Sequence, residues 1–268
     1  MTYRELLARV YSVLDARLKE QEEKSGNSSG TTQISALPTE SYQEKHEGPS
    51  SAPASEISEE SPAKMFAESI QNWPIFSDSS SALARLAKHF KLVILSNVDN
   101  DSLGWTHKLL SLGSTHDTGT FPDLYSYPIP NPNKFWHPQE TSGSKSPFTA
   151  ILTAQDVGCY KPSLEGFRTA LDYIRSQPEL FGITDVVDAA EVPRDRTKEK
   201  VLSVAQSLRH DIEPANSLGL HTVWIDRQSA VTCNEAGMGK PGWGKWTWRF
   251  ETLGAMADAV ENELGTAV

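Results

Sequence analysis

The sequence has 268 residues, of which 38% are hydrophobic, 22% charged and 9% aromatic, and this length fits one large domain or two small ones. Lys and Arg number 25 against 35 for Asp and Glu, so the formal net charge is −10. That balance argues against general binding to nucleic acid or to anionic membranes, since both need a cationic face. No apolar run is long enough for a transmembrane helix, and Cys159 and Cys233 match no metal or redox spacing. We therefore expect a soluble, cytoplasmic protein with reduced cysteines.

The first part of the chain predicts two helices separated by a polar segment. Apolar residues at 6, 7, 10, 13 and 14 form a helical stripe and predict a helix over 3–18. Residues 19–62 are dominated by Ser, Glu, Gly and Pro, and Tyr42 is their only aromatic residue. Such a segment buries too little apolar surface to offset its chain entropy, so we expect it to be disordered. A second helix is expected near 64–71.

The rest of the chain alternates strands and helices. Strands are predicted over 92–95, 148–152, 201–204 and 222–225, and helices over 81–89, 163–175, 214–218 and 252–264. The first strand is wholly apolar, as expected of a strand buried on both faces. Asp78 or Ser79 is the expected N-cap of the first helix, and Pro162 is expected in the first turn of the second. This order predicts an α/β fold with a mostly parallel sheet, whose site lies at the carboxyl ends of the strands.

Two segments of this part are predicted to lack regular structure. Residues 114–147 contain six prolines, which exclude a long helix, and their aromatic residues suggest docking on a surface. The run at 243–250, WGKWTWRF, could be a stacking platform. We favour aromatic packing of a loop before the last helix, because Gly242 and Gly244 fit a turn.

Polar residues follow three of the predicted strands. Ser96 and Asn97 come after the first, Lys161 after the second, next to the helix that Pro162 opens, and Asp211 after the third. Each has an ordinary alternative: a Ser-Asn pair is often a turn, a Lys-Pro pair is often solvated, and Asp211 could cap the following helix. All three together, each after a strand, are more specific.

These motifs resemble those of the haloacid dehalogenase-like (HAD) hydrolase superfamily, and of the fungal haloacid dehalogenases in particular. LVILSN is similar to the second motif, VGCYKP to the third, and VAQSLRHD followed by ANSLGLHTVWIDR to the fourth. The resemblance covers roughly residues 1–18, 63–113 and 146–265. It implies a small helical cap over 1–72, interrupted by 19–62, and a Rossmann-like core over 73–268, interrupted by 114–147.

The resemblance also implies a chemistry. In this superfamily an Asp attacks the substrate and forms an ester that water hydrolyses. Lys161 would keep that Asp ionised, Asp211 would orient Lys161 or a water, and Ser96 and Asn97 would donate hydrogen bonds to the substrate anion or leaving halide. The fourth motif adds three supporting residues, Gln206, Ser207 and His210. The expected substrate is a small anion that carries a carboxylate with a halogen, or a phosphate.

The identity of residue 206 affects whether the sequence predicts a Mg²⁺ site. The phosphatase branch of the superfamily binds Mg²⁺ through an acidic pair in the fourth motif, and Gln206 stands where the first acid would be. An uncharged amide is a poor Mg²⁺ ligand. We therefore expect metal-free, dehalogenase-type chemistry without a cofactor, and Mg²⁺ only if the protein is a phosphatase.

The first motif of the superfamily, a strand ending in Asp, is not found before Ser96. The Asp residues there are Asp15, inside a helical stripe, and Asp78, at a helix start. The resemblance thus implies that the first central strand is absent and that a buried slot opens between the strands ending at Ser96 and Ala205. We expect an incomplete version of a longer enzyme, inactive as it stands. The alternatives are a non-catalytic relative that acts as a binding or interaction protein, or an unrelated α/β binding domain.

Overall fold

The computed structural model describes residues 2–26, 61–113, 124–128, 131, 134–183, 196–227 and 245–265. The chain divides into two compact units, Tyr3–Ile70 and Gln71–Val268. In the described residues no helix is long and apolar enough to cross a membrane.

The first unit is a pair of helices. It contains α1 (Tyr3–Gly26) and α2 (Pro62–Glu68), and α2 runs on into the 3-10 turn η1 (Ser69–Asn72). Ser61 caps α2 by accepting a hydrogen bond from the Lys64 backbone nitrogen at 3.2 Å, and Pro62 takes the first helical position. The helices pack through a small apolar core made of Leu7, Ala8, Ala63, Ala67 and Ile70.

Helix α1 is longer than the sequence predicts. It continues to Gly26, so the prediction of disorder is wrong for residues 19–26, and residues 27–60 of the same segment lie outside the described residues. Lys, Glu and Gln are strong helix formers, and Lys19 pairs with Asp15 one turn earlier at 2.7 Å. The charged composition that suggests disorder therefore also suits an exposed helix.

The second unit is built on parallel strands, which form two separate sheets in the described residues. One sheet pairs β1 (Leu92–Ser96) with β2 (Phe148–Thr153), and the other has the order β3 (Leu202–Ala205), β4 (His221–Ile225), β5 (Trp248–Phe250). Every pairing is parallel. The predicted α/β class with a Rossmann-like arrangement is confirmed.

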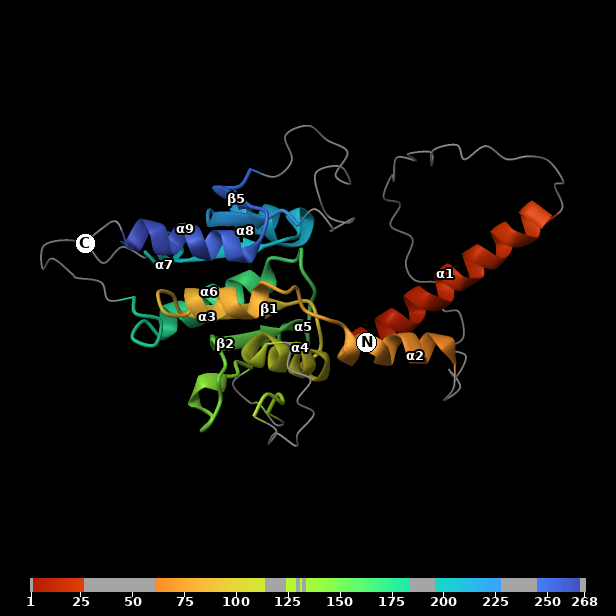
Figure 1. The fold of residues 1–268 in the computed structure, drawn as a ribbon, viewed down its shortest axis with the longest axis horizontal. Helices are drawn as coiled ribbons and strands as arrows, with labels where there is room; N and C mark the ends of the chain where they lie inside the picture. The colour runs from red at the N-terminus through yellow and green to blue at the C-terminus, as the bar shows by residue number, and fades with distance from the viewer. Residues whose placement is uncertain are drawn as a thin grey trace, which may run out of the picture. The chain divides into compact units, whose positions relative to one another are not determined.

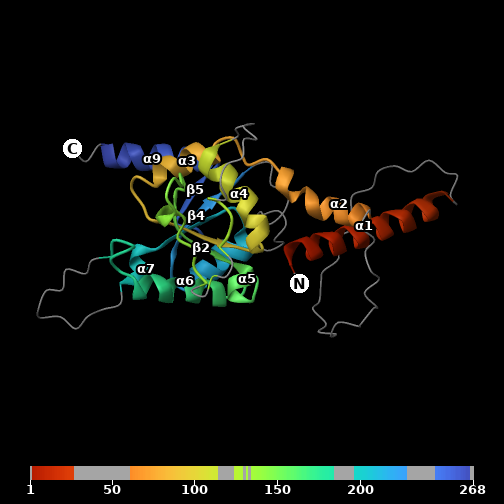
Figure 2. The ribbon, with the colours of Figure 1, turned by 90° about the horizontal axis from the view of Figure 1, so that it is seen from below.

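Helices cover both faces of these strands (Figures 1 and 2). In Figure 2, α3 (Ser79–Leu86), α4 (Asn100–Leu112) and α9 (Leu253–Gly265) lie on one face. The opposite face carries α5 (Ala154–Val157), α6 (Glu165–Ser176) and α7 (Thr197–Lys200). The remaining short elements are η2 (Pro138–Glu140), the π-helical turn η3 (Leu208–Ile212) and α8 (Glu213–Ser217).

Each helical layer packs against both sheets. Leu86 of α3 and Met256 of α9 lie in one apolar cluster with Val223 of β4, and Leu92 of β1 packs against that cluster. On the other face, Phe167 and Leu171 of α6 lie in a cluster with Ala215 of α8, and Leu95 and Val201 pack against it. The two sheets are therefore held side by side by the same helices.

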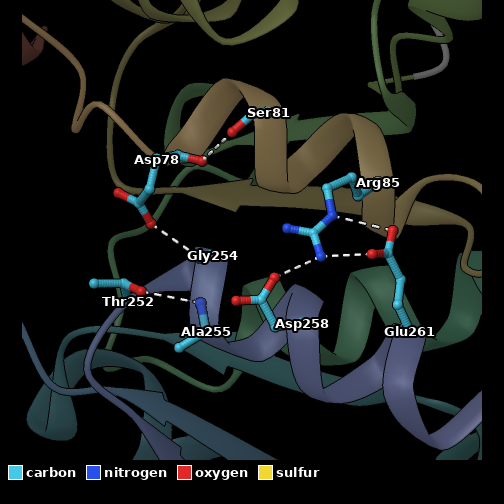
Figure 3. A network of polar contacts seen from close by, with 8 residues as sticks. All are labelled: Asp78, Ser81, Arg85, Thr252, Gly254, Ala255, Asp258 and Glu261. Carbon is cyan, nitrogen blue, oxygen red and sulfur yellow. Dashed lines mark hydrogen bonds and ion pairs between the residues drawn. The ribbon is translucent and has the colours of Figure 1, made fainter.

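Polar contacts fasten α3 to α9 (Figure 3). Arg85 donates to Glu261 at 3.0 Å and 2.5 Å and to Asp258 at 2.6 Å. At the other end, the Asp78 carboxylate accepts a hydrogen bond from the Gly254 backbone nitrogen at 3.0 Å. These two helices, far apart in sequence, thus form one layer.

Several sequence predictions need correction. The expected strand at 92–95 is β1, but its residues are half-buried, not buried on both faces. The predicted loop at 243–250 contains a strand, β5, whose residues pair with β4. Helix α6 begins at Glu165, so Pro162 precedes its first turn. Helix α3 spans 79–86 in place of the predicted 81–89, and Asp78 occupies the N-cap position without a side-chain cap bond.

The described part of the predicted insertion at 114–147 is packed into the core. Four aromatic residues there are buried: Tyr125, Tyr127, Phe135 and Trp136. Trp136 also forms an antiparallel bridge with Ile151 of β2. The expected docking of aromatic residues is thus seen for these four, whereas Phe121 lies outside the described residues.

Candidate functional site

Lys161 lies at the carboxyl edge of both sheets. Its Nζ donates to Oδ1 of Asp211 at 2.6 Å and to the backbone oxygen of Leu95 at 2.8 Å. The two side chains are largely buried, with 12% of Lys161 and 15% of Asp211 exposed. The ammonium group therefore joins the end of β1 to η3, the turn that follows β3.

Asn97 holds the backbone of Lys161 in place. Its Oδ1 accepts a hydrogen bond from the Lys161 backbone nitrogen at 2.7 Å, and its Nδ2 donates to the Lys161 carbonyl oxygen at 3.0 Å. The Asn97 side chain thus bonds to both backbone polar groups of Lys161. These two hydrogen bonds fix the segment that carries Lys161 to the end of β1.

Ser96 is the last residue of β1 and is half-buried. It stands in register with Thr153, the last residue of β2. Its role as a donor to the substrate, and the same role for Asn97, stay predictions, although both residues lie at the expected edge.

The turn after β3 presents Asp211. Ser207 caps η3, since its Oγ accepts a hydrogen bond from the His210 backbone nitrogen at 3.1 Å and lies 3.1 Å from His210 Nδ1. The Gln206 carbonyl oxygen accepts from Trp224 Nε1 at 2.9 Å. Asp211 lies within η3, and the N-cap of α8 is Ile212. The alternative that Asp211 caps the following helix therefore does not hold.

A second polar network lies at the ends of β1 and β2 and is absent from the sequence-based prediction. Asp156 Oδ2 accepts hydrogen bonds from the Thr153 backbone nitrogen, the Thr153 hydroxyl and the Tyr127 hydroxyl, at 2.7 Å to 3.0 Å. Burial, then the contact with Asp156, raises the pKa of Tyr127. The Thr153–Asp156 pair is a capping box, and the spacing of TAQD is the sequence signal that would have identified it.

Asp99 is the N-cap of the helix that follows it. Its Oδ1 accepts a hydrogen bond from the Ser102 backbone nitrogen at 2.7 Å, which caps α4. Asp211 is therefore the carboxylate that the described residues bring to Lys161. Among those residues, no group of three or more His, Cys, Asp or Glu side chains is placed to hold a metal ion.

The comparisons with known proteins find similarity among solved structures. No protein-family model matches the sequence, and no curated protein matches it. Among solved structures, the chain is similar to YfnB from Bacillus subtilis, assigned to the HAD-hydrolases and solved bound to magnesium. The identity is 15%, the TM-score is 0.43, and the match covers 76% of this chain and 64% of the YfnB chain. The chain thus spans less than two thirds of YfnB.

Proposed function

We propose that this chain is the core of a haloacid dehalogenase-like hydrolase that acts on a small anion through an aspartyl ester. The observation that carries the proposal is the convergence of Asn97, Lys161 and Asp211 from three different strand ends. A buried ammonium next to the carboxyl edge attracts a carboxylate or phosphate and keeps a nucleophilic carboxylate ionised. Ser96 is close in sequence to these groups and would donate to the same anion.

The proposed substrate carries a carboxylate and a halogen, or a phosphate. An attacking carboxylate oxygen forms a bond to the carbon or phosphorus, and the halide or alkoxide leaves with the bonding electrons. Water then hydrolyses the ester. Asp211 is engaged with Lys161, so we assign it the role of orienting Lys161 and not that of the nucleophile.

We also propose that the chemistry needs no metal. Gln206 offers no charge at the fourth motif, and Asp211, the acid of that motif, is bonded to Lys161 and so is not free to bind a metal ion. Lys161 would then supply the positive charge that a phosphatase of this superfamily takes from Mg²⁺.

A second candidate is a non-catalytic protein that binds anions in the same site. Asp99 and Asp156 favour it, since both carboxylates near the strand ends are taken up by helix caps. The described residues thus leave Lys161 without a second carboxylate that could attack.

The test supplies the nucleophile from solution. The purified chain should release no chloride from 2-chloropropionate above a Lys161→Met control, because no described carboxylate can attack. Formate added in excess can take the place of the missing carboxylate, so we expect formate-dependent chloride release that disappears in Lys161→Met. EDTA should change that rate by less than about twofold.

Chloride release by the chain alone would support the hydrolase and would show that its nucleophile is already present in the chain. Two outcomes would contradict the proposal. Formate-dependent release that Lys161→Met retains would remove Lys161 from the mechanism. Binding of 2-chloropropionate without any formate-dependent release would favour the anion-binding protein.

A further inference from the structure

The loops that follow β1 and β2 are joined to each other by side-chain hydrogen bonds. Asn97, in the first loop, bonds to the backbone of Lys161 in the second. Closer to β2, the Asn100 backbone nitrogen donates to Gln155 Oε1 at 3.1 Å, and the Thr153 hydroxyl donates to Asn100 Oδ1 at 2.5 Å. The loop after β1 therefore holds the segment from Thr153 to Lys161 near both of its ends.

Asp156 lies between these ends, on the single turn α5. Its Oδ2 accepts a hydrogen bond from the Thr153 backbone nitrogen at 3.0 Å, and its Oδ1 accepts one from Asn100 Nδ2 at 3.4 Å. Gly158 ends α5 with a φ of 87°, a left-handed conformation that favours glycine. Lys161 follows three residues later. The orientation of α5 therefore determines the direction in which the chain approaches Lys161.

One donor to Asp156 comes from outside these two loops. The Tyr127 hydroxyl, from the predicted insertion at 114–147, donates to Asp156 Oδ2 at 2.8 Å. Its side chain is buried and belongs to an apolar cluster with Leu103 of α4 and Ile151 of β2. Burial, and then the contact with Asp156, raises the pKa of Tyr127, so its hydroxyl keeps its proton at neutral pH. A donor whose position is fixed by the core thus contacts α5.

A count of hydroxyl hydrogens shows why Asp156 needs this donor. A hydroxyl group has one hydrogen to donate. The Thr153 hydroxyl has two acceptors within reach, Asp156 Oδ2 at 2.7 Å and Asn100 Oδ1 at 2.5 Å. When it donates to Asn100, Tyr127 is the hydroxyl that donates to Asp156. The Tyr127 hydroxyl also lies 2.9 Å from the Lys134 carbonyl oxygen, but a carboxylate accepts the stronger hydrogen bond.

We propose that Tyr127 is a positioning residue for Lys161 and acts through Asp156 and α5. Its hydroxyl fixes α5, and α5 in turn helps to keep the Lys161 ammonium between Leu95 and Asp211. Packing of the insertion is thereby coupled to the candidate site. The effect on the position of Lys161 does not depend on the proposed hydrolase function, whereas the effect on turnover rests on that function.

The nitrogen resonance of the Lys161 ammonium group tests the positioning. We would assign it in the nitrogen-15-labelled full chain by its loss in Lys161→Met, and compare the variants at one pH. Tyr127→Phe keeps the buried ring but removes the donor to Asp156, so the Lys161 resonance should shift and broaden. The change should occur without loss of the fold, which circular dichroism checks.

Tyr125→Phe is the matched control. Tyr125 lies in the same segment as Tyr127 and is 5% exposed, and its hydroxyl accepts a hydrogen bond from the Lys145 backbone nitrogen at 3.1 Å. This variant also removes one hydroxyl from a buried tyrosine, but it removes no hydrogen bond to α5. It should leave the Lys161 resonance unchanged even if it lowers the thermal midpoint as much as Tyr127→Phe does.

Asp156→Ala tests the route from Tyr127 to Lys161. It should also shift the Lys161 resonance, because it releases α5 from the donors that Asp156 binds. In the Asp156→Ala background, Tyr127→Phe should add no further shift, since the two residues act in series. The Asp156→Ala variant alone also tests the role of α5 if Tyr127→Phe does not fold.

The formate-dependent release of chloride gives a second readout. Tyr127→Phe should lower kcat about fivefold and change KM for 2-chloropropionate by less than about twofold. The ammonium group would still attract the anion, but its position would be less well fixed. A change in KM alone, or an equal loss of kcat in Tyr125→Phe, would contradict the positioning role.

The proposal is overturned if Tyr127→Phe leaves the Lys161 resonance unchanged, or if Tyr125→Phe shifts it equally. A further shift on adding Tyr127→Phe to Asp156→Ala would overturn the route through α5. A shifted resonance in Tyr127→Phe, together with no formate-dependent chloride release by the wild type, would support the positioning and contradict the hydrolase function alone.

Discussion

At the scale of single residues, the position of Lys161 depends on oxygen atoms that surround its ammonium group. A lysine side chain with only 12% of its surface exposed loses most of its hydration, which is costly unless the charge is paired. Asp211 supplies the opposite charge and Leu95 a carbonyl oxygen. Asn97 fixes the backbone on which this arrangement depends. The site is therefore preorganised around a cation that can interact with an anion.

His107 gives a residue-scale prediction about pH. Its ring is fully buried, with Nε2 2.7 Å from Ser146 Oγ, and burial lowers its pKa to about 4, against a weaker opposing effect of the Tyr125 carbonyl. The unfolded chain binds the proton near pH 6.5, so stability is complete above that pH and falls as the pH drops toward 4. Urea unfolding should show a loss of about 2 kcal/mol between pH 7.5 and pH 5.

His107→Gln is the control for this prediction. Glutamine keeps a polar group for Ser146 but does not titrate, so this variant should show a flatter profile over the same range. An unchanged slope in His107→Gln would mean that other groups cause the pH dependence.

At the scale of elements, Asp78 connects the start of α3 with the end of β4 and with α9. Arg227, which follows β4, donates to both Asp78 oxygens at 2.9 Å and 3.2 Å, and Gly254 of α9 donates at 3.0 Å. Partial burial would raise the pKa of Asp78, but the hydrogen bonds from Arg227 and Gly254 lower it overall. The carboxylate that could have capped α3 is used to bind its neighbours.

Removing that carboxylate should destabilise the second unit. We expect Asp78→Ala to lower the free energy of unfolding by about 1–3 kcal/mol, since it removes the carboxylate that pairs with Arg227 and leaves that arginine its contacts with Ser79 and Phe76 alone. Asp258→Ala is the matched control, because it also removes an arginine partner but at a site where 63% of the side chain is exposed. Thermal unfolding followed by circular dichroism measures both, and equal losses would contradict the special role of Asp78.

The sequence predicted those elements whose own residues determine them. The runs that form β1, β2 and β4 are short and apolar, and each ends near a polar motif. Helix α4 is not among the predicted elements, although Asp99, just after Asn97, is its N-cap. Strand β5 was missed because its three residues become a strand only by pairing with β4.

The candidate site also has features that the sequence predicts and features that it does not. The strand ends placed Lys161 and Asp211 at one edge of a parallel arrangement, and the structure brings them to 2.6 Å. The hydrogen bonds from Asn97 to the Lys161 backbone depend on the path of the chain between β2 and α6, which the local sequence does not specify. The proline next to Lys161 suggested a helix start, whereas α6 begins three residues later.

At the scale of the whole molecule, the described residues of the second unit form two parallel sheets that share helical layers and are linked through Lys161, which bonds to Leu95 and Asp211. The chain carries a net charge of −10, so the proposed anionic substrate would meet general repulsion and would depend on a local cation. Lys161 provides it at the point where the sheets meet. The same residue thus serves the architecture and the proposed chemistry.

A double-mutant cycle on Lys161 and Asp211 tests this central claim most directly. The free energy of unfolding in urea would be measured for the wild type, Lys161→Met, Asp211→Asn and the double variant. Each single change leaves a largely buried group without its partner, so we expect a coupling energy of at least about 1 kcal/mol, with the double variant losing less than the sum. Single effects that add to within about 0.5 kcal/mol would contradict the account, because the two side chains would then not form the pair on which the site is built.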